Sequence, residues 1–228
     1  MAFRINQFRE TELDHDLNFL KQSLFPCAVL VPKVEKRETL LNLLYVLPQN
    51  VVKVIPILET KGGLENALDI FSIEDKRIEN LAFGHCDLNL DLSIFPFVHQ
   101  YNPQYWLWIE QLNALGERFS KGILNSPYLA LKNLDGFSQM LKNLVDYPSV
   151  VGQVSLSISQ TQSIKDFNAS GSDSGIEYYN LETKPMSVDW PLDFEIHRVQ
   201  DRSFAYLQDG LVFSPQEFQA SQLKTRGV

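Results

Sequence analysis

The sequence has 228 residues, of which 44% are hydrophobic and 21% charged, as expected of one folded globular domain. Its formal net charge of −8 argues against a nucleic-acid-binding protein, which needs clustered Lys and Arg. No apolar run is long enough to span a membrane, and the first residues are too charged for a signal peptide. We therefore expect neither a nucleic-acid nor a membrane partner. Cys27 and Cys86 lie in apolar runs and are expected to be reduced, which favours a cytoplasmic protein.

The first half of the chain alternates between strand and helix patterns. Short apolar runs predict strands, and apolar side chains spaced three or four apart predict helices. The predicted strands are residues 3–6, 27–34, 51–59 and 80–87. The predicted helices follow them at residues 13–20, 37–46 and 62–79. This order is typical of a parallel α/β fold.

Two of these strands end in acidic residues, Glu59 and Asp87. Both runs are apolar and β-branched, so we expect strands that are buried on both faces. Carboxylates at the carboxyl ends of neighbouring strands are typical of the site of a (β/α)8 barrel. There they often hold a divalent metal, because hard cations prefer oxygen ligands. The alternative is that both are ordinary carboxylates, solvated or capping the next helix.

The second half continues the alternation and then changes. We expect a helix in the second half of residues 95–119, a strand at the start of 119–131, a helix at 134–147, a strand at 150–159 and a helix or loop at 160–168. Residues 169–175 are small and polar, which predicts a linker. A hairpin turning at Gln208 to Gly210 and a helix begun by Ser214 and Pro215 should follow.

These patterns predict an α/β fold of the TIM (β/α)8 type that is incomplete or divergent, with a C-terminal hairpin and helix extension. About six βα units are present, whereas a closed barrel has eight. We expect a barrel domain at residues 1–168 and the linker, hairpin and helix at 169–228. Open sheet edges are usually covered. We therefore expect a homo-oligomer, or a partner polypeptide that completes the barrel.

The order of short motifs resembles the citrate lyase β-subunit and HpcH/HpaI aldolase superfamily. The matching segments are FRIN, VPKVE, ILETKGGLENA, FGHCDLNLDLS, GILNSPYLALKNLDGF, VSLSISQTQSIKDFN and LQDGLVFSPQEFQA. The resemblance implies that Glu59 and Asp87 bind Mg2+ (or Mn2+) and that Arg4 binds a carboxylate or enolate oxygen of the substrate. Mg2+ would act as a Lewis acid, and an arginine would bind the same oxygens in a planar, bidentate way.

The residues around these positions suggest further roles. Lys33 could add positive charge beside Arg4, although Lys33 and Glu35 could equally form a surface ion pair of little effect. Gly62 and Gly63 predict a tight turn whose backbone N–H groups approach an anionic substrate. His85 could contact the substrate as an acid or base, or be structural. The candidate catalytic residues are thus Arg4 and Lys33.

Together these observations predict a Mg2+-dependent carbon–carbon lyase or aldolase-like enzyme for a small 2-oxo or 3-hydroxy carboxylate or its CoA thioester. Several positions depart from the family pattern. Cys86 stands where the citrate lyase branch usually has Glu, and Gly62, Ser159 and Ser214 replace an arginine, a histidine and an aspartate. A non-catalytic binding or assembly subunit of the same fold is therefore the alternative hypothesis. A third is a fragment completed by another polypeptide.

Overall fold

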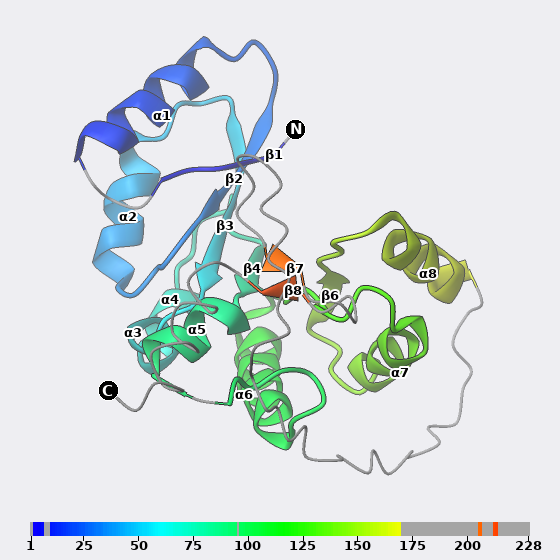
Figure 1. Ribbon diagram of the computed structural model, residues 1–228. Coiled ribbons are helices and arrows are strands. Elements are labelled where there is room, and N and C mark those ends of the chain that lie inside the picture. The colour runs from blue at the N-terminus through cyan, green and yellow to red at the C-terminus, as the bar shows by residue number, and fades with distance from the viewer. Residues whose placement is uncertain (1, 7–9, 95, 170–204, 207–211, 214–228) are drawn as a thin grey trace.

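The fold is known from a computed structural model that describes residues 2–6, 10–94, 96–169, 205–206 and 212–213. Its main unit is a sheet of six parallel strands in the sequential order β1-β2-β3-β4-β5-β6 (Figure 1). Helices connect successive strands, as parallel pairing requires. Sequential parallel strands are the arrangement of a TIM-type barrel, here incomplete. The predicted α/β fold of six βα units is therefore confirmed.

The strands and helices follow the predicted order closely. The strands of the sheet are β1 (Ala2–Arg4), β2 (Cys27–Val31), β3 (Val51–Leu58), β4 (Asn80–Phe83), β5 (Gly122–Asn125) and β6 (Val150–Gln153). The helices are α1 (Glu10–Gln22), α2 (Arg37–Val46), α3 (Lys61–Glu65), α4 (Ala67–Phe71), α5 (His85–Asp91), α6 (Pro103–Phe119), α7 (Leu134–Leu144) and α8 (Ile158–Ala169). The prediction for residues 37–46 matches α2 at both ends.

Helices cover one face of the sheet and form the core with it. Along β2 every second residue is buried, and Val29 lies beside Val54 of β3 on this covered face. Leu20 of α1 and Leu40 of α2 join the same core. Figure 1 shows α1 and α2 on one side of β1 to β3, and α7 and α8 together beside β6. Apolar burial of this kind is the main stabilising contribution to the fold.

The predicted burial of β3 on both faces is only partly right. Its second half, from Pro56 to Leu58, is buried, but Val52 and Lys53 near its start are exposed. Lys53 forms a salt bridge with Glu79, with 2.7 Å between Nζ and Oε2. The helix predicted over residues 62–79 is also shorter than expected. It consists of α3 and α4, separated at Asn66 by non-helical dihedral angles.

The prediction that the strand at residues 80–87 ends at Asp87 is wrong. β4 ends at Phe83, and Gly84 begins helix α5, whose first turn contains Asp87. The buried residues of this segment are His85, Leu88 and Asn89, which have helical rather than alternating spacing. The glycine after the apolar run, not the acidic residue, therefore marks the end of the strand.

The C-terminal part is described only at two short strands. β7 (Ala205–Tyr206) pairs antiparallel with β8 (Val212–Phe213), as the predicted hairpin requires. The predicted linker at 169–175 and helix at 214–224 lie outside the described residues, apart from Ala169 at the end of α8. The division into domains 1–168 and 169–228 therefore stays a prediction. No helix in the described part of the chain is both long and apolar enough to cross a membrane.

Candidate functional site

The carboxyl ends of the strands meet at one edge of the sheet, and the predicted site residues lie there. Arg4 is the last residue of β1, and Lys33 follows the end of β2. Glu59 comes directly after β3, and Asp87 lies just beyond β4 in α5. Parallel α/β folds place their functional residues at this edge, because every strand delivers its next residues to it.

Glu59 is the centre of this cluster. Its side chain is only 6% exposed, and its Oε1 atom accepts two hydrogen bonds. The backbone N–H of Lys33 donates at 3.0 Å, and Arg4 donates through Nη2 at 3.3 Å. The Arg4 side chain is 57% exposed, so it reaches a buried carboxylate from the solvent side. The structure thus brings three predicted residues together.

The second oxygen of Glu59, Oε2, lies on the side of Gly84. A Cβ atom at Gly84 would come within 2.9 Å of Oε2 and 2.6 Å of the Glu59 Cβ. Only a residue without a side chain therefore lets Glu59 take this position. Both hydrogen bonds that Glu59 accepts are to Oε1, and no donor among the described residues reaches Oε2.

The pKa of Glu59 is raised from 4.5 to about 7. Burial is the main cause, because it disfavours the charged carboxylate, and the charge of Asp87 is the second. Arg4 and the Lys33 N–H oppose the shift. Two carboxyl groups therefore repel one another electrostatically across this edge. A divalent cation between them would relieve that repulsion.

The donor set fits a hard cation. Among the residues that the structure describes, no group of three or more His, Cys, Asp or Glu side chains is placed to hold a metal. The predicted ligands are only two, the carboxyl groups of Glu59 and Asp87, which act on one another electrostatically. Mg2+ prefers oxygen ligands and commonly binds through one or two carboxylates, keeping other positions for water and substrate. The pair fits Mg2+ better than zinc, which favours nitrogen and sulfur ligands.

The glycines of the predicted anion-binding turn have packing roles in the structure. The Gly63 N–H donates to the Thr60 side chain at 3.0 Å, which caps α3. A Cβ at Gly63 would also lie 2.6 Å from the Val34 carbonyl oxygen. Gly62 lies against Glu35, with 3.3 Å from an ideal Cβ to Cδ. The N–H of Gly63 is therefore engaged, and its substrate contact stays a prediction.

His85 does not face the solvent. Its side chain is fully buried, and its Nδ1 contacts Ser126 Oγ while Nε2 lies 2.9 Å from His99 Nδ1. Burial lowers the pKa of His85 well below its usual value, and the neighbouring His99 lowers it further. The pKa of His99 falls to about 4 because it is buried. Both imidazoles are neutral at pH 7, and the contact that we predicted between His85 and a substrate stays a prediction.

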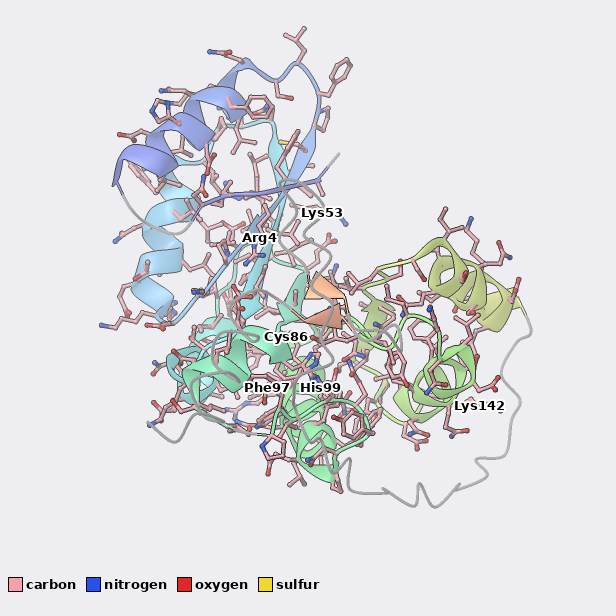
Figure 2. The ribbon with its side chains drawn as sticks, in the orientation of Figure 1. Arg4, Lys53, Cys86, Phe97, His99 and Lys142 are labelled. Carbon is pink, nitrogen blue, oxygen red and sulfur yellow. The ribbon has the colours of Figure 1, made fainter. Side chains whose placement is uncertain are left out.

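Further polar groups at the same edge did not emerge from the sequence. Tyr105 donates to Asn125 at 2.7 Å, and the Asn125 amide donates to Gln153 at 2.7 Å. Gln153 in turn donates to the Ser126 carbonyl at 2.8 Å. Figure 2 shows His99 and Cys86 near β4, in the middle of the molecule. The signal that could have found this network is the polar pair Asn125–Ser126 at the end of a predicted strand.

Comparisons with known proteins agree with this architecture. No protein-family model matches the sequence, and no curated protein matches it. Solved structures do match. RipC from Yersinia pestis is 19% identical with a TM-score of 0.63, covering 72% of this chain and 74% of RipC. The citrate lyase beta subunit of M. tuberculosis, complexed with oxaloacetate and magnesium, is 18% identical with a TM-score of 0.60, covering 72% and 71%.

The chain has the citrate lyase beta fold. A further structure of this fold, CitE from Mycobacterium tuberculosis in complex with magnesium and pyruvate, is 17% identical with a TM-score of 0.61. The match covers 77% of this chain and 70% of the CitE chain. The resemblance found from the short motifs is therefore confirmed for the fold. At these identities the likeness does not by itself assign residues, so the roles depend on the geometry of this chain.

Proposed function

We propose that the protein is a Mg2+-dependent carbon–carbon lyase or aldolase-like enzyme that acts on a small 2-oxo or 3-hydroxy carboxylate. One observation carries the proposal. The carboxyl group of Glu59 lies at the carboxyl edge of a citrate lyase beta fold, where burial and then the charge of Asp87 raise its pKa. Its Oε2 atom has no donor among the described residues. Buried like charges of this kind favour a bound cation.

Glu59 and Asp87 would hold the metal. When bound, Mg2+ supplies a Lewis acid that stabilises negative charge on the oxygens of a carbonyl substrate. Arg4 would bind the substrate carboxylate, because its exposed guanidinium uses one Nη2 for Glu59 and keeps further N–H donors. Lys33 would add positive charge, as its backbone is fixed beside Glu59.

The nature of the substrate is inferred from the neighbours. Oxaloacetate and pyruvate accompany magnesium in two of them, and both are small 2-oxo carboxylates. A third carries magnesium, acetoacetate and coenzyme A, which supports a CoA thioester as the other substrate class. For this chain both classes are proposals, to be separated by turnover of 4-hydroxy-2-oxo acids and of 3-hydroxyacyl-CoA thioesters.

The metal site is tested by calorimetric titration with Mg2+ and Mn2+. We expect binding by the wild type and its loss in Asp87→Ala, which removes one of two carboxylate ligands. Glu79→Gln is the matched control, since Glu79 is an exposed carboxylate before β4 that pairs with Lys53 at the other end of the strands. Absence of binding by the wild type, or unchanged binding by Asp87→Ala, would contradict the proposal.

A non-catalytic binding subunit is the second candidate. The Arg4–Glu59 ion pair favours it, because the buried carboxylate already has a cationic partner. Such a protein would bind the carboxylate ligand without turning it over. Purified protein that binds pyruvate or oxaloacetate and Mg2+, yet cleaves none of the candidate substrates, would favour this function over the enzyme.

The assembly state and location also belong to this proposal. β1 and β6 are the outer strands of the six-stranded sheet. Unpaired outer strands are usually covered in proteins. We therefore propose a homo-oligomer, or a partner that completes the barrel, and a cytoplasmic location. Light scattering of the purified protein tests the oligomer directly.

A further inference from the structure

Helix α5 carries Asp87 but has little stability of its own. It is only seven residues long, and no side chain caps it at Gly84. Short isolated helices are marginal in water, and the N–H groups of a first turn lack intrahelical partners. The position of Asp87 therefore depends on what holds this helix from outside.

Ser126, directly after β5, holds the first turn. Its Oγ accepts the backbone N–H of His85 at 3.2 Å and also bonds the His85 ring at Nδ1. One hydroxyl thus satisfies a first-turn N–H group that would otherwise be buried without a partner. Ser126 and His85 are both fully buried, so neither contact competes with water.

Both ring nitrogens of His85 have a partner. The Ser126 hydroxyl accepts the His85 backbone N–H and contacts Nδ1, while Nε2 lies 2.9 Å from His99 Nδ1. A serine hydroxyl has one proton and two lone pairs, so it can bond the backbone and the ring at once. The imidazole is therefore held between two partners, which suits a positioning role.

The rest of α5 is held in the same way. The Asn89 side chain bonds both the carbonyl and the N–H of Val98, at 2.8 and 3.0 Å. Asp91 accepts the backbone N–H of Lys61 at 2.7 Å, two residues after Glu59. The helix with Asp87 is thereby connected at its start to Ser126, directly after β5, and at its end to the first residue of α3.

We infer that Ser126 and His85 are positioning residues that fix the first turn of α5 and so set the place of Asp87 relative to Glu59. The inference rests on the proposed function, since it takes Asp87 as a metal ligand. Groups that orient metal ligands typically contribute about 10- to 100-fold in metal affinity. Removing the Ser126 hydroxyl should weaken the metal site although Ser126 itself does not bind metal.

The experiment compares Mn2+ affinity, by electron paramagnetic resonance, in the wild type, Ser126→Ala and Tyr105→Phe. The two variants each remove one buried hydroxyl of the same network, but only the Ser126 hydroxyl bonds to α5, whereas the Tyr105 hydroxyl bonds to Asn125. Tyr105→Phe keeps the ring that packs against His85. We expect Ser126→Ala to lose affinity by about 10-fold or more. Tyr105→Phe should keep the wild-type affinity while losing thermal stability.

Asp91→Ala provides a second variant that folds more readily, because the Asp91 contact is at the surface. We expect it to lower Mn2+ affinity by less than Ser126→Ala. Equal losses in Ser126→Ala and Tyr105→Phe would show general loosening and overturn the inference. So would wild-type affinity in Ser126→Ala. A wild type that binds no Mn2+ would instead refute the proposed metal site itself.

Discussion

The two halves of the carboxyl edge use polar residues in opposite ways. After β1 to β3 the residues are charged, and the exposed Arg4 contacts the buried Glu59 from the solvent side. After β4 and β5, apart from the half-buried Asp87, the polar residues that face one another are neutral, and His85 and Ser126 are both fully buried. Charges near water can bind ions and substrates, whereas buried neutral groups must satisfy one another. One edge of one sheet thus contains a candidate binding site and the framework that supports it.

The largest loss of stability should come from a substitution in the buried half of the carboxyl edge, after β4 and β5. Tyr105 is fully buried, packs against Phe83 and His85, and donates to Asn125. We expect Tyr105→Ala to lower the free energy of unfolding by about 3 to 5 kcal/mol, the usual cost of removing a buried aromatic ring. Urea denaturation followed by fluorescence measures it. A cost no larger than that of an exposed substitution would contradict the supporting role of this half.

The two halves should also respond oppositely to pH. Glu59 has its pKa raised from 4.5 to about 7. The folded state therefore holds this proton more tightly, and the stability due to this group is lost as pH rises through about 7. His99 has its pKa lowered from 6.5 to about 4. The unfolded state holds that proton more tightly, so stability is lost as pH falls from about 6.5 toward 4.

Glu59→Gln separates the two contributions. At about 1.4 kcal/mol per pKa unit, the shift of Glu59 corresponds to roughly 3 kcal/mol between pH 4.5 and neutral pH. We expect the variant to gain stability relative to the wild type across that range, and to keep the acid instability caused by the histidines. Denaturation at a series of pH values measures both. A stability difference between the two proteins that is constant with pH would contradict the raised pKa.

The smallest stability change is expected at Arg4. Its side chain is more than half exposed, and exposed ion pairs contribute less than about 1 kcal/mol. Arg4→Gln should therefore leave the unfolding midpoint nearly unchanged, while the pKa of Glu59 rises because an opposing positive charge is gone. Carbon-13 NMR of the carboxyl group follows this pKa. A large loss of stability would show that Arg4 belongs to the structural half.

Sequence reasoning worked where periodicity determined the structure. The alternation of strands and helices, the bounds of α2 and the placement of Glu59 directly after β3 all follow from apolar spacing. The edge of a parallel sheet then brings Arg4, Lys33 and Glu59 together. That the three share one edge follows from the strand order, whereas the hydrogen bonds of Glu59 with Arg4 and Lys33 were not predicted.

Sequence reasoning failed where tertiary contacts determine the local structure. His85 to Asp91 form a helix because Gly84 ends β4 and Ser126, far along the chain, holds the first turn. No short-range pattern contains that contact. The partners of His85 were missed for the same reason. No sequence pattern links His85 with Ser126 or His99, which contact it only in the folded chain.

The most direct test of the metal site is a crystal structure of the protein soaked with Mn2+ and pyruvate. Manganese gives an anomalous signal that locates the ion without ambiguity. The account predicts one peak bonded to Glu59 Oε2 and an Asp87 carboxylate oxygen, with the pyruvate carboxylate beside Arg4. A peak elsewhere, or none at these two carboxylates at millimolar Mn2+, would contradict it.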